Sequence, residues 1–267
     1  DGVSGDGAGV MTDIPFALLG YEPHSVAVAC LFLTPDLGRR AVALEAFEST
    51  FGLLGLEVVG YRDVPVNRDV LGPIARAAAP HVVHAFVRRP EPCGTDHAFN
   101  AQLYQAKQMT RAALLERGAW MDLFFTSLSA NTIVYKAMCR SVDLEPFYPD
   151  LANPSFETRF GLFHRRFSTN TRSSWDKAQP FRVVAHNGEI NTIAGNRSWA
   201  YSRERALGLA RNQLVTHSEI SDSGNLGEVV EALMFRSSMP HLDDILAITI
   251  PPAAMKSDYY AFWSRAM

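Results

Sequence analysis

The sequence predicts a domain of mixed α and β layers around a single core. Segments with the pattern of β-strands alternate along the chain with segments whose apolar residues have helical spacing. Hydrophobic residues make up 47% and charged residues 20% of the 267 positions, which is typical of a globular chain. No repeat, charge run or low-complexity linker interrupts the alternation. We therefore expect one domain across residues 1–267, without an internal boundary.

Apolar spacing defines the elements of the first half. Residues 26–33 form an unbroken apolar run of strand length, and residues 40–54 carry apolar side chains at helical spacing. Residues 121–127 and 132–137 are two closely spaced strands with polar residues between them, which indicates a hairpin. The other predictions are strands at 56–60 and 81–87, a short helix at 70–79 and a long amphipathic helix at 98–117.

The second half predicts strands at 156–164 and 181–186 and helices at 193–209 and 224–236. The last helix has the clearest pattern. Asn225, with Glu228 three residues later, resembles a capping box at its start. Its apolar stripe consists of Leu226, Val229, Val230, Leu233 and Met234.

The composition argues against several classes of function. A formal net charge of -3 gives no electrostatic footprint for nucleic acid or for an anionic membrane. No apolar run approaches the roughly 18 residues of a membrane span. Cys30, Cys93 and Cys139 are far apart without a CxxC pair, so we expect no disulfide framework, no metal site and a reducing cytoplasm. The chain opens in a glycine-rich stretch without an initiator Met, so we expect both ends to be cuts through a longer protein.

A polar segment at residues 164–171 directly follows a predicted strand. It contains Arg165 and Arg166 beside hydroxyl and amide side chains, among them Thr169. The planar guanidinium fork of an arginine matches the two oxygens of a carboxylate, so Arg166 is a candidate carboxylate receptor. A solvated strand end with surface arginines would have the same composition, and that alternative stays open.

Asn187 and Gly188 follow the predicted strand at 181–186. An Asn-Gly pair is first of all typical of a type I′ turn. A tight turn also exposes a backbone N–H beside the side-chain N–H of the asparagine, and two such donors aimed at one point make an oxyanion hole. Both interpretations stay open on the local pattern.

Asp222 lies between two serines just before the helix at 224–236. An aspartate there is typical of a helix cap. Alternatively, it is a counter-ion for an ammonium group. An arginine for a carboxylate, an aspartate for an amine and an Asn-Gly pair for an oxyanion together describe a receptor for an α-amino acid, which suits amide hydrolysis. The stretch from Gly5 to Gly9 lacks the Lys-Ser/Thr of a phosphate loop, so we do not expect it to bind phosphate.

A collinear series of motifs resembles the N-terminal glutaminase domain of the glutamate synthase large subunit, a class II glutamine amidotransferase. The likeness runs in order along nearly the whole chain. The motifs are Asp6-Gly7-Ala8-Gly9, Tyr61-Arg62-Asp63-Val64-Pro65, Ser127-Leu128-Ser129, Thr132-Ile133-Val134-Tyr135-Lys136, Phe147-Tyr148-Pro149-Asp150-Leu151, Arg166-Phe167-Ser168-Thr169-Asn170-Thr171, Ala178-Gln179-Pro180-Phe181-Arg182 and Ala185 through Asn191.

The resemblance implies an α+β fold, a four-layer αββα sandwich of the N-terminal-nucleophile hydrolase type. In that family an N-terminal cysteine attacks the side-chain amide of glutamine, its own α-amino group acts as base, and a thioester is hydrolysed to give glutamate and ammonia. The ammonia reaches downstream synthase domains of the same chain, where FMN and a 3Fe-4S iron–sulfur cluster support reductive amination of 2-oxoglutarate. Those cofactors are expected in the full-length parent and none in this segment. The electron donor, a small subunit using reduced nicotinamide or a ferredoxin, stays open.

The resemblance also assigns roles to particular residues. Arg166 matches the arginine that holds the α-carboxylate of glutamine, and Asp222 matches the aspartate that binds its α-amine. Asn187 and Gly188 match the oxyanion-hole pair, and Thr169 is a further substrate contact.

The chain departs from the family pattern at the nucleophile. We expect the catalytic cysteine upstream of the Asp6–Gly9 stretch, because no cysteine of this chain matches its position, and we expect the segment alone to be inactive. Two alternatives remain: another class II amidotransferase, and a glutamine-binding module without catalysis.

Overall fold

The computed structural model describes residues 5–92, 94–166, 173–186, 193–206, 208–210, 220–237 and 241–249. The strands are β1 (Ala8–Asp13), β2 (Val26–Leu33), β3 (Val58–Asp63), β4 (His81–Arg88), β5 (Leu123–Ser129), β6 (Thr132–Ala137) and β7 (Gly161–His164). The helices are α1 (Phe16–Leu19), α2 (Leu37–Leu53), α3 (Pro73–Ala77), α4 (Asp96–Glu116), α5 (Leu144–Phe147), α6 (Ile193–Ala206), α7 (Asp222–Arg236) and α8 (Leu242–Thr249), with 3-10 turns η1 (Arg68–Val70), η2 (Ser141–Asp143) and η3 (Pro149–Ala152).

Two antiparallel sheets form the centre of the described structure. One has the strand order β6-β1-β7 and the other β3-β4-β2-β5. β1 is the middle strand of the first sheet, where Gly9 pairs with Lys136 on one side and His164 on the other. Because β1 holds both neighbours, it fixes the strand ends that lead into the predicted site. The family resemblance implied a structural loop at Gly5–Gly9, which is wrong from Ala8 onward.

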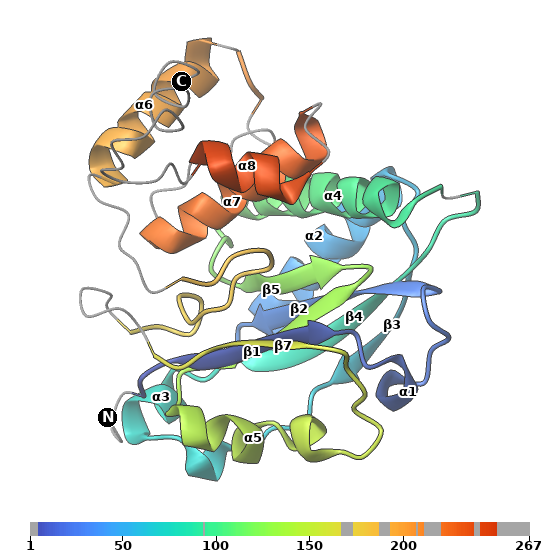
Figure 1. Cartoon of the computed structure of the whole chain (residues 1–267), viewed down its shortest axis with the longest axis vertical. Helices are drawn as coiled ribbons and strands as arrows, with labels where there is room; N and C mark the ends of the chain where they lie inside the picture. Colours follow the sequence, from blue (N-terminus) through green and yellow to red (C-terminus); the bar gives the residue numbers. More distant parts are fainter. Residues whose placement is uncertain are drawn as a thin grey trace.

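The two faces of β2 pack into different cores. Ala29 and Leu31 belong to an apolar cluster shared with α2 and α4, whereas Val28 and Phe32 belong to a second cluster shared with β6. In Figure 1, α2 and α4 accordingly lie on one side of the four-stranded sheet, and β1 and β7 lie on the other. The order is therefore helices, sheet, sheet, which explains why every residue of β2 is apolar.

The described ranges do not show the fourth layer of the predicted sandwich. Leu162 and Phe163 on β7 are 39% and 68% exposed, so no helix covers this strand in that part of the chain. The mixed α and β content with two antiparallel sheets agrees with the prediction, while the four-layer arrangement stays a prediction. Within the described helices, none is both long and apolar enough to span a membrane.

The predicted hairpin at residues 121–137 is wrong, although both strands exist. β5 pairs with β2 and β6 pairs with β1, so the chain crosses from one sheet to the other at this turn. Serine hydroxyls replace the missing ladder, because Ser129 Oγ accepts from the backbone N–H groups of Asn131 and Thr132, and Ser127 Oγ accepts from Val134 N. Apolar patterning marks strands but does not say which sheet they join.

The strand predicted at 181–186 is also wrong. Phe181 N donates to Val184 O at 2.9 Å, which closes a local turn. His186 N donates to the side-chain oxygen of Gln179 at 3.0 Å. Local and side-chain partners therefore satisfy these backbone groups, and the segment 173–186 runs between α7 and the sheets as an irregular strap (gold in Figure 1).

Candidate active site

Arg166 lies two residues beyond the end of β7, and its side chain is exposed. β7 is held against β1 through the pairs Gly9–His164 and Val10–Phe163. The guanidinium group therefore belongs to a residue close to the end of a paired strand. This position agrees with both interpretations of the segment, the carboxylate receptor and the solvated strand end.

Asp222 is the first residue of α7 and is half-buried. It is not the cap, because Ser221 Oγ accepts from Gly224 N at 3.0 Å as the N-cap. The predicted capping box is therefore wrong: Asn225 lies inside the first turn and donates to Ser221 O at 3.1 Å. As a residue of the first turn, the Asp222 carboxylate lies at the positive end of the helix dipole.

Thr169, Asn187 and Gly188 lie outside the described residues. The residue before Asn187 is held from two directions. His186 O lies 3.0 Å from His164 Nε2, and because a carbonyl only accepts, the histidine donates. His186 N donates to Gln179 Oε1. The strand end before Arg166 and the residue before Asn187 are therefore side by side.

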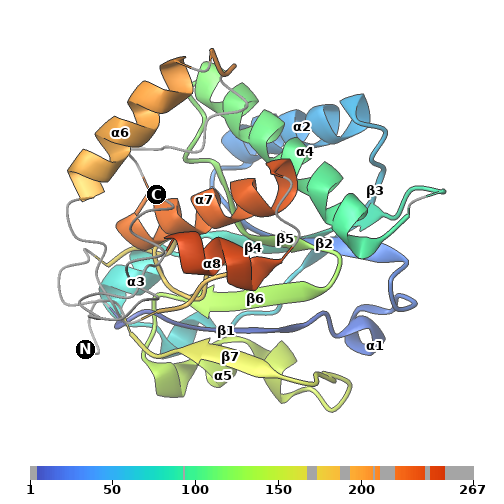
Figure 2. The ribbon, with the colours of Figure 1, turned by 45° about the horizontal axis from the view of Figure 1, so that its top comes forward.

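The helix that carries Asp222 packs against the same strap. A Cβ placed on Gly227 of α7 would lie 3.6 Å from the Cβ of Phe181. Arg182 points its guanidinium carbon at the Phe235 ring, 5.1 Å from the centroid, and its Nε donates to Leu128 O at 2.7 Å. Figure 2 shows α7 beside α8, with α4 behind it. Three segments singled out in the sequence thus adjoin one another through residues 173–186.

A cleft of about 980 Å³ opens between α7, the strap and β5. Ser221 and Gly224 of α7 line it together with Asp176 and Phe181 of the strap. Its mixed apolar and polar lining and its volume suit a small-molecule ligand. Asp222 directly follows a lining residue, so the cleft adjoins the N-terminus of α7.

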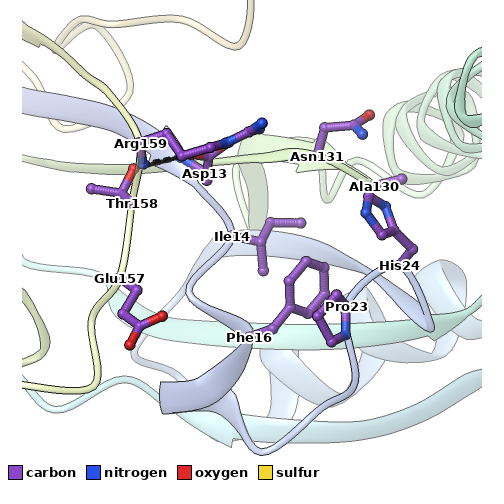
Figure 3. A pocket seen from close by; sticks show the side chains of 10 residues that line it. All are labelled: Asp13, Ile14, Phe16, Pro23, His24, Ala130, Asn131, Glu157, Thr158 and Arg159. Carbon is purple, nitrogen blue, oxygen red and sulfur yellow. Dashed lines mark hydrogen bonds and ion pairs between the residues drawn. The ribbon is translucent and has the colours of Figure 1, made fainter.

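A second pocket, of about 410 Å³, lies at the C-terminal end of β1 (Figure 3). Asp13, the last residue of that strand, accepts from the Arg159 guanidinium at 2.8 Å at its edge. Figure 3 shows the rings of Phe16 and His24 nearby. None of the sequence-predicted site residues lines this pocket, so we do not assign it to the active site.

Buried charges join α4 to α7 beside the cleft. Lys107 Nζ lies 2.8 Å from Glu231 and 3.2 Å from Glu228, and Arg111 lies 2.8 Å from Glu228. Side-chain exposures of 6% for Lys107 and 7% for Glu231 make this a desolvated pair. The sequence did not predict this pair, because partners 124 residues apart give no local signal.

Lys136 of β6 has no exposed surface, and its burial was not predicted from the sequence either. Its Nζ donates to Asp176 O at 2.7 Å and lies 4.9 Å from the ring centroids of both Phe124 and Phe181. The available signal was a lone lysine in an apolar strand. Burial lowers its pKa to about 7, while the charges of Asp176 and Cys30 act in the opposite direction.

The described cysteines are core residues. Cys30 and Cys139 are buried free thiols, and burial raises the pKa of each to about 12. A thiol that resists ionisation is a poor nucleophile and a poor ligand. Cys93 lies outside the described residues. Among those residues, no group of three or more His, Cys, Asp and Glu side chains is arranged to hold a metal ion.

Comparison with known proteins places these features in a family. The family model of the class-II glutamine amidotransferases matches residues 1–266. Ferredoxin-dependent glutamate synthase 2 of Synechocystis is 39% identical over 275 residues, covering 96% of this chain and 17% of that protein. The chloroplastic ferredoxin-dependent glutamate synthase 2 of Arabidopsis thaliana is 38% identical over 270 residues, covering 95% of this chain and 16% of that protein.

A more distant relative is the NADH glutamate synthase of Schizosaccharomyces pombe, 32% identical over 270 residues, covering 93% of this chain and 13% of that protein. The chain thus spans less than a fifth of the length of each of these relatives. The match of a family model along 266 positions covers both sheets and every segment of the candidate site. The chain belongs to the class-II glutamine amidotransferases.

Proposed function

We propose that this chain is the glutaminase domain of a glutamate synthase, which hydrolyses glutamine to glutamate and ammonia and passes the ammonia to a synthase domain. The observation that carries the proposal is the family match over residues 1–266, together with 38% and 39% identity to two glutamate synthases. The neighbouring positions of the segments that bear Arg166, Asn187 and Asp222 support it. Another class II amidotransferase would share the site but not this similarity to glutamate synthases.

In the proposed site Arg166 binds the α-carboxylate of glutamine and Asp222 binds its α-ammonium group. Thr169 contacts the substrate beside Arg166. Asn187 and Gly188 donate to the oxygen of the side-chain amide as it becomes an oxyanion. The exposed guanidinium of Arg166 and the half-buried carboxylate of Asp222 have the charges that these roles require.

We propose an N-terminal cysteine of the mature full-length protein as the nucleophile. The described cysteines are unsuited, because burial holds the pKa of Cys30 and Cys139 at about 12. We propose that the iron–sulfur cluster belongs to another part of the full-length protein, since a cluster needs several thiolates. As the family resemblance implies, FMN is proposed to bind in the synthase domain. We further propose the four-layer αββα sandwich for the complete domain, and a reducing compartment such as the cytoplasm, which suits the free thiols.

The electron donor of the full-length protein is proposed to be ferredoxin. The two relatives named for ferredoxin are 38% and 39% identical to this chain, while the relative named for NADH is 32% identical. Measuring 2-oxoglutarate-dependent glutamate formation with reduced ferredoxin and with NADH separates the two donors.

The site assignment is tested in the full-length protein by glutamate release from glutamine. Arg166→Ala should raise KM by roughly 30-fold or more, because charge-assisted binding of the carboxylate is lost. Asn187→Asp should lower kcat by about 10²–10³, because an anionic acceptor replaces an oxyanion donor. Arg165→Ala is the matched control, since Arg165 is also exposed and adjacent.

Each outcome separates the catalytic interpretation from the structural one. Asp also accepts a turn conformation, so Asn187→Asp should leave Tm nearly unchanged. A loss of Tm that parallels the loss of kcat would favour the hairpin turn. An Arg166→Ala protein with the kinetics of Arg165→Ala would make Arg166 a surface residue.

A further inference from the structure

Lys136 is a lysine in the core of the described structure. Its ammonium group is fully buried, and within the described residues its contacts are one backbone carbonyl and two aromatic rings. Taking an ammonium group out of water carries a large desolvation penalty. A buried lysine at this place is therefore poorly explained by stability, which points to a geometric role.

The contacts of Lys136 converge on the strap, residues 173–186. The carbonyl of Asp176 accepts its hydrogen bond, and the ring of Phe181 lies over its Nζ at 4.9 Å. An ammonium over an aromatic face is attracted by the ring quadrupole, and more strongly once it is desolvated. One side chain on β6 thus holds the strap at two points five residues apart.

The strap also approaches the β1–β6 strand pair closely at a third point. Gly9 is the cross-strand partner of Lys136, and a Cβ at Gly9 would lie 2.6 Å from Gln179 O. Gln179 Oε1 in turn accepts from His186 N, and His186 immediately precedes Asn187. Lys136 is therefore linked, through Gln179 and His186 of the strap, to the residue that begins the proposed oxyanion hole.

We propose that Lys136 is a positioning residue for glutamine hydrolysis, whose ammonium fixes the strap and thereby positions His186, the residue directly before the proposed oxyanion-hole pair. This inference rests on the proposed function. Arg166 follows β7 and Asp222 begins α7, so neither substrate-binding residue is carried on the strap. Lys136 should therefore affect the transition state more than the binding of glutamine.

The first test is Lys136→Met in the full-length protein, because Met fills the space between the two rings without a charge. We expect kcat for glutamate release to fall by roughly 10–100-fold, less than for outright removal of an oxyanion donor. KM should stay within about twofold and Tm should not fall. An unchanged kcat, or a kcat that falls together with Tm and with a rise in KM, would overturn the proposal.

The pH profile provides a readout that a merely structural lysine would not move. Burial lowers the pKa of Lys136 to about 7, while Asp176 of the strap and Cys30 of β2 act in the opposite direction. Wild-type kcat should therefore decline as the ammonium is lost above about pH 7. Lys136→Arg should abolish that decline, because a guanidinium stays charged at every usable pH. A decline that persists unchanged in Lys136→Arg would overturn the assignment.

Phe181→Leu covers the case in which a variant at position 136 does not fold. This substitution removes one aromatic face that stabilises the ammonium group. We therefore expect kcat to fall at constant KM and the decline of kcat with pH to begin at a lower pH. A profile identical to wild type would count against Lys136. Asn187→Asp separates the two levels of the argument: if it lowers kcat and the Lys136 and Phe181 variants do not, only this inference fails. If Asn187→Asp is silent too, the proposed function fails with it.

Discussion

At Gly9, β1, β6 and the strap approach one another closely. A Cβ on Gly9 would lie 2.6 Å from Gln179 O and 2.7 Å from Lys136 Cβ. Gly9→Ala should therefore lower the free energy of unfolding by roughly 1–3 kcal/mol, because neither the carbonyl nor a strand Cβ can move away freely. Urea unfolding of the full-length protein, followed by a probe in this domain, measures the change.

Gly52 offers a matched control for this substitution. It lies in α2, and a Cβ there would meet nothing within 4 Å. Gly52→Ala should raise the free energy of unfolding by about 0.5–1 kcal/mol, because alanine has the higher helix propensity. If both variants behave alike, the close approach at Gly9 is wrong.

Side-chain chemistry suggested some candidate site residues and left others hidden. Arg166 and Asp222 could be chosen because their charges complement an amino acid. Lys136 could not, because a single lysine in a strand usually faces solvent and its acceptor, Asp176 O, lies 40 residues further on. Chemistry can be read from one residue, whereas burial depends on what folds over it.

At the scale of elements, the α4–α7 contact depends on a buried charge pair. Lys107→Met should destabilise the domain by about 3–5 kcal/mol, because it leaves Glu231 and Glu228 buried with one cation fewer. Arg88→Met is the control, since the Arg88–Glu57 pair is 61% and 63% exposed and should change stability by only about 0–1 kcal/mol. Thermal and urea unfolding of both variants give the comparison.

Since α7 carries Asp222, this pair should also affect substrate binding. Lys107→Met should raise KM for glutamine, and the double variant Lys107→Met with Glu231→Met should recover part of the stability. A Lys107→Met protein as stable as Arg88→Met would mean that solvent reaches the pair.

Element positions were more predictable than element partners. The strand at 26–33 and the long helix now described as α4 were clear, because their apolar patterns are strong and local. The crossing between β5 and β6 was not, since serine hydroxyls and a hairpin ladder leave the same alternation in the sequence. Ser221, rather than Asp222 or Asn225, caps α7, and all three residue types favour that position.

At the scale of the whole molecule, the sequence pattern predicted helical layers and sheet layers but not the order in which they stack. β1 was missed, because a strand that begins Ala8-Gly9 has little β-propensity of its own. Pairing with β6 and β7 on both sides makes it a strand. The prediction of one domain across 1–267 stays a prediction. The two sheets pack against each other over a shared core. One residue buried between them should make the free energy of unfolding depend on pH in acid.

His84 of β4 is fully buried between the sheets, 5.6 Å from the Tyr135 ring, and its two ring nitrogens find no hydrogen-bond partner in the described part of the chain. Burial, and next the charge of Arg62, lower its pKa from 6.5 to about 3. Between these values the unfolded chain binds a proton that the folded chain excludes. The free energy of unfolding should therefore fall as the pH drops below about 6.5, by up to about 1.4 kcal/mol per pH unit from this residue.

His84→Phe removes the titrating group and keeps an aromatic ring in the core. The stability difference between wild type and His84→Phe should be constant above about pH 6.5 and should move against the wild type by roughly 2 kcal/mol at pH 5. Phe86→Leu, on the same strand, changes core packing without a titratable group, so its difference from wild type should not vary with pH. Urea unfolding at several pH values measures all three proteins. A flat difference for His84→Phe would mean that the folded protein accepts the proton, and that water or a carboxylate reaches the ring.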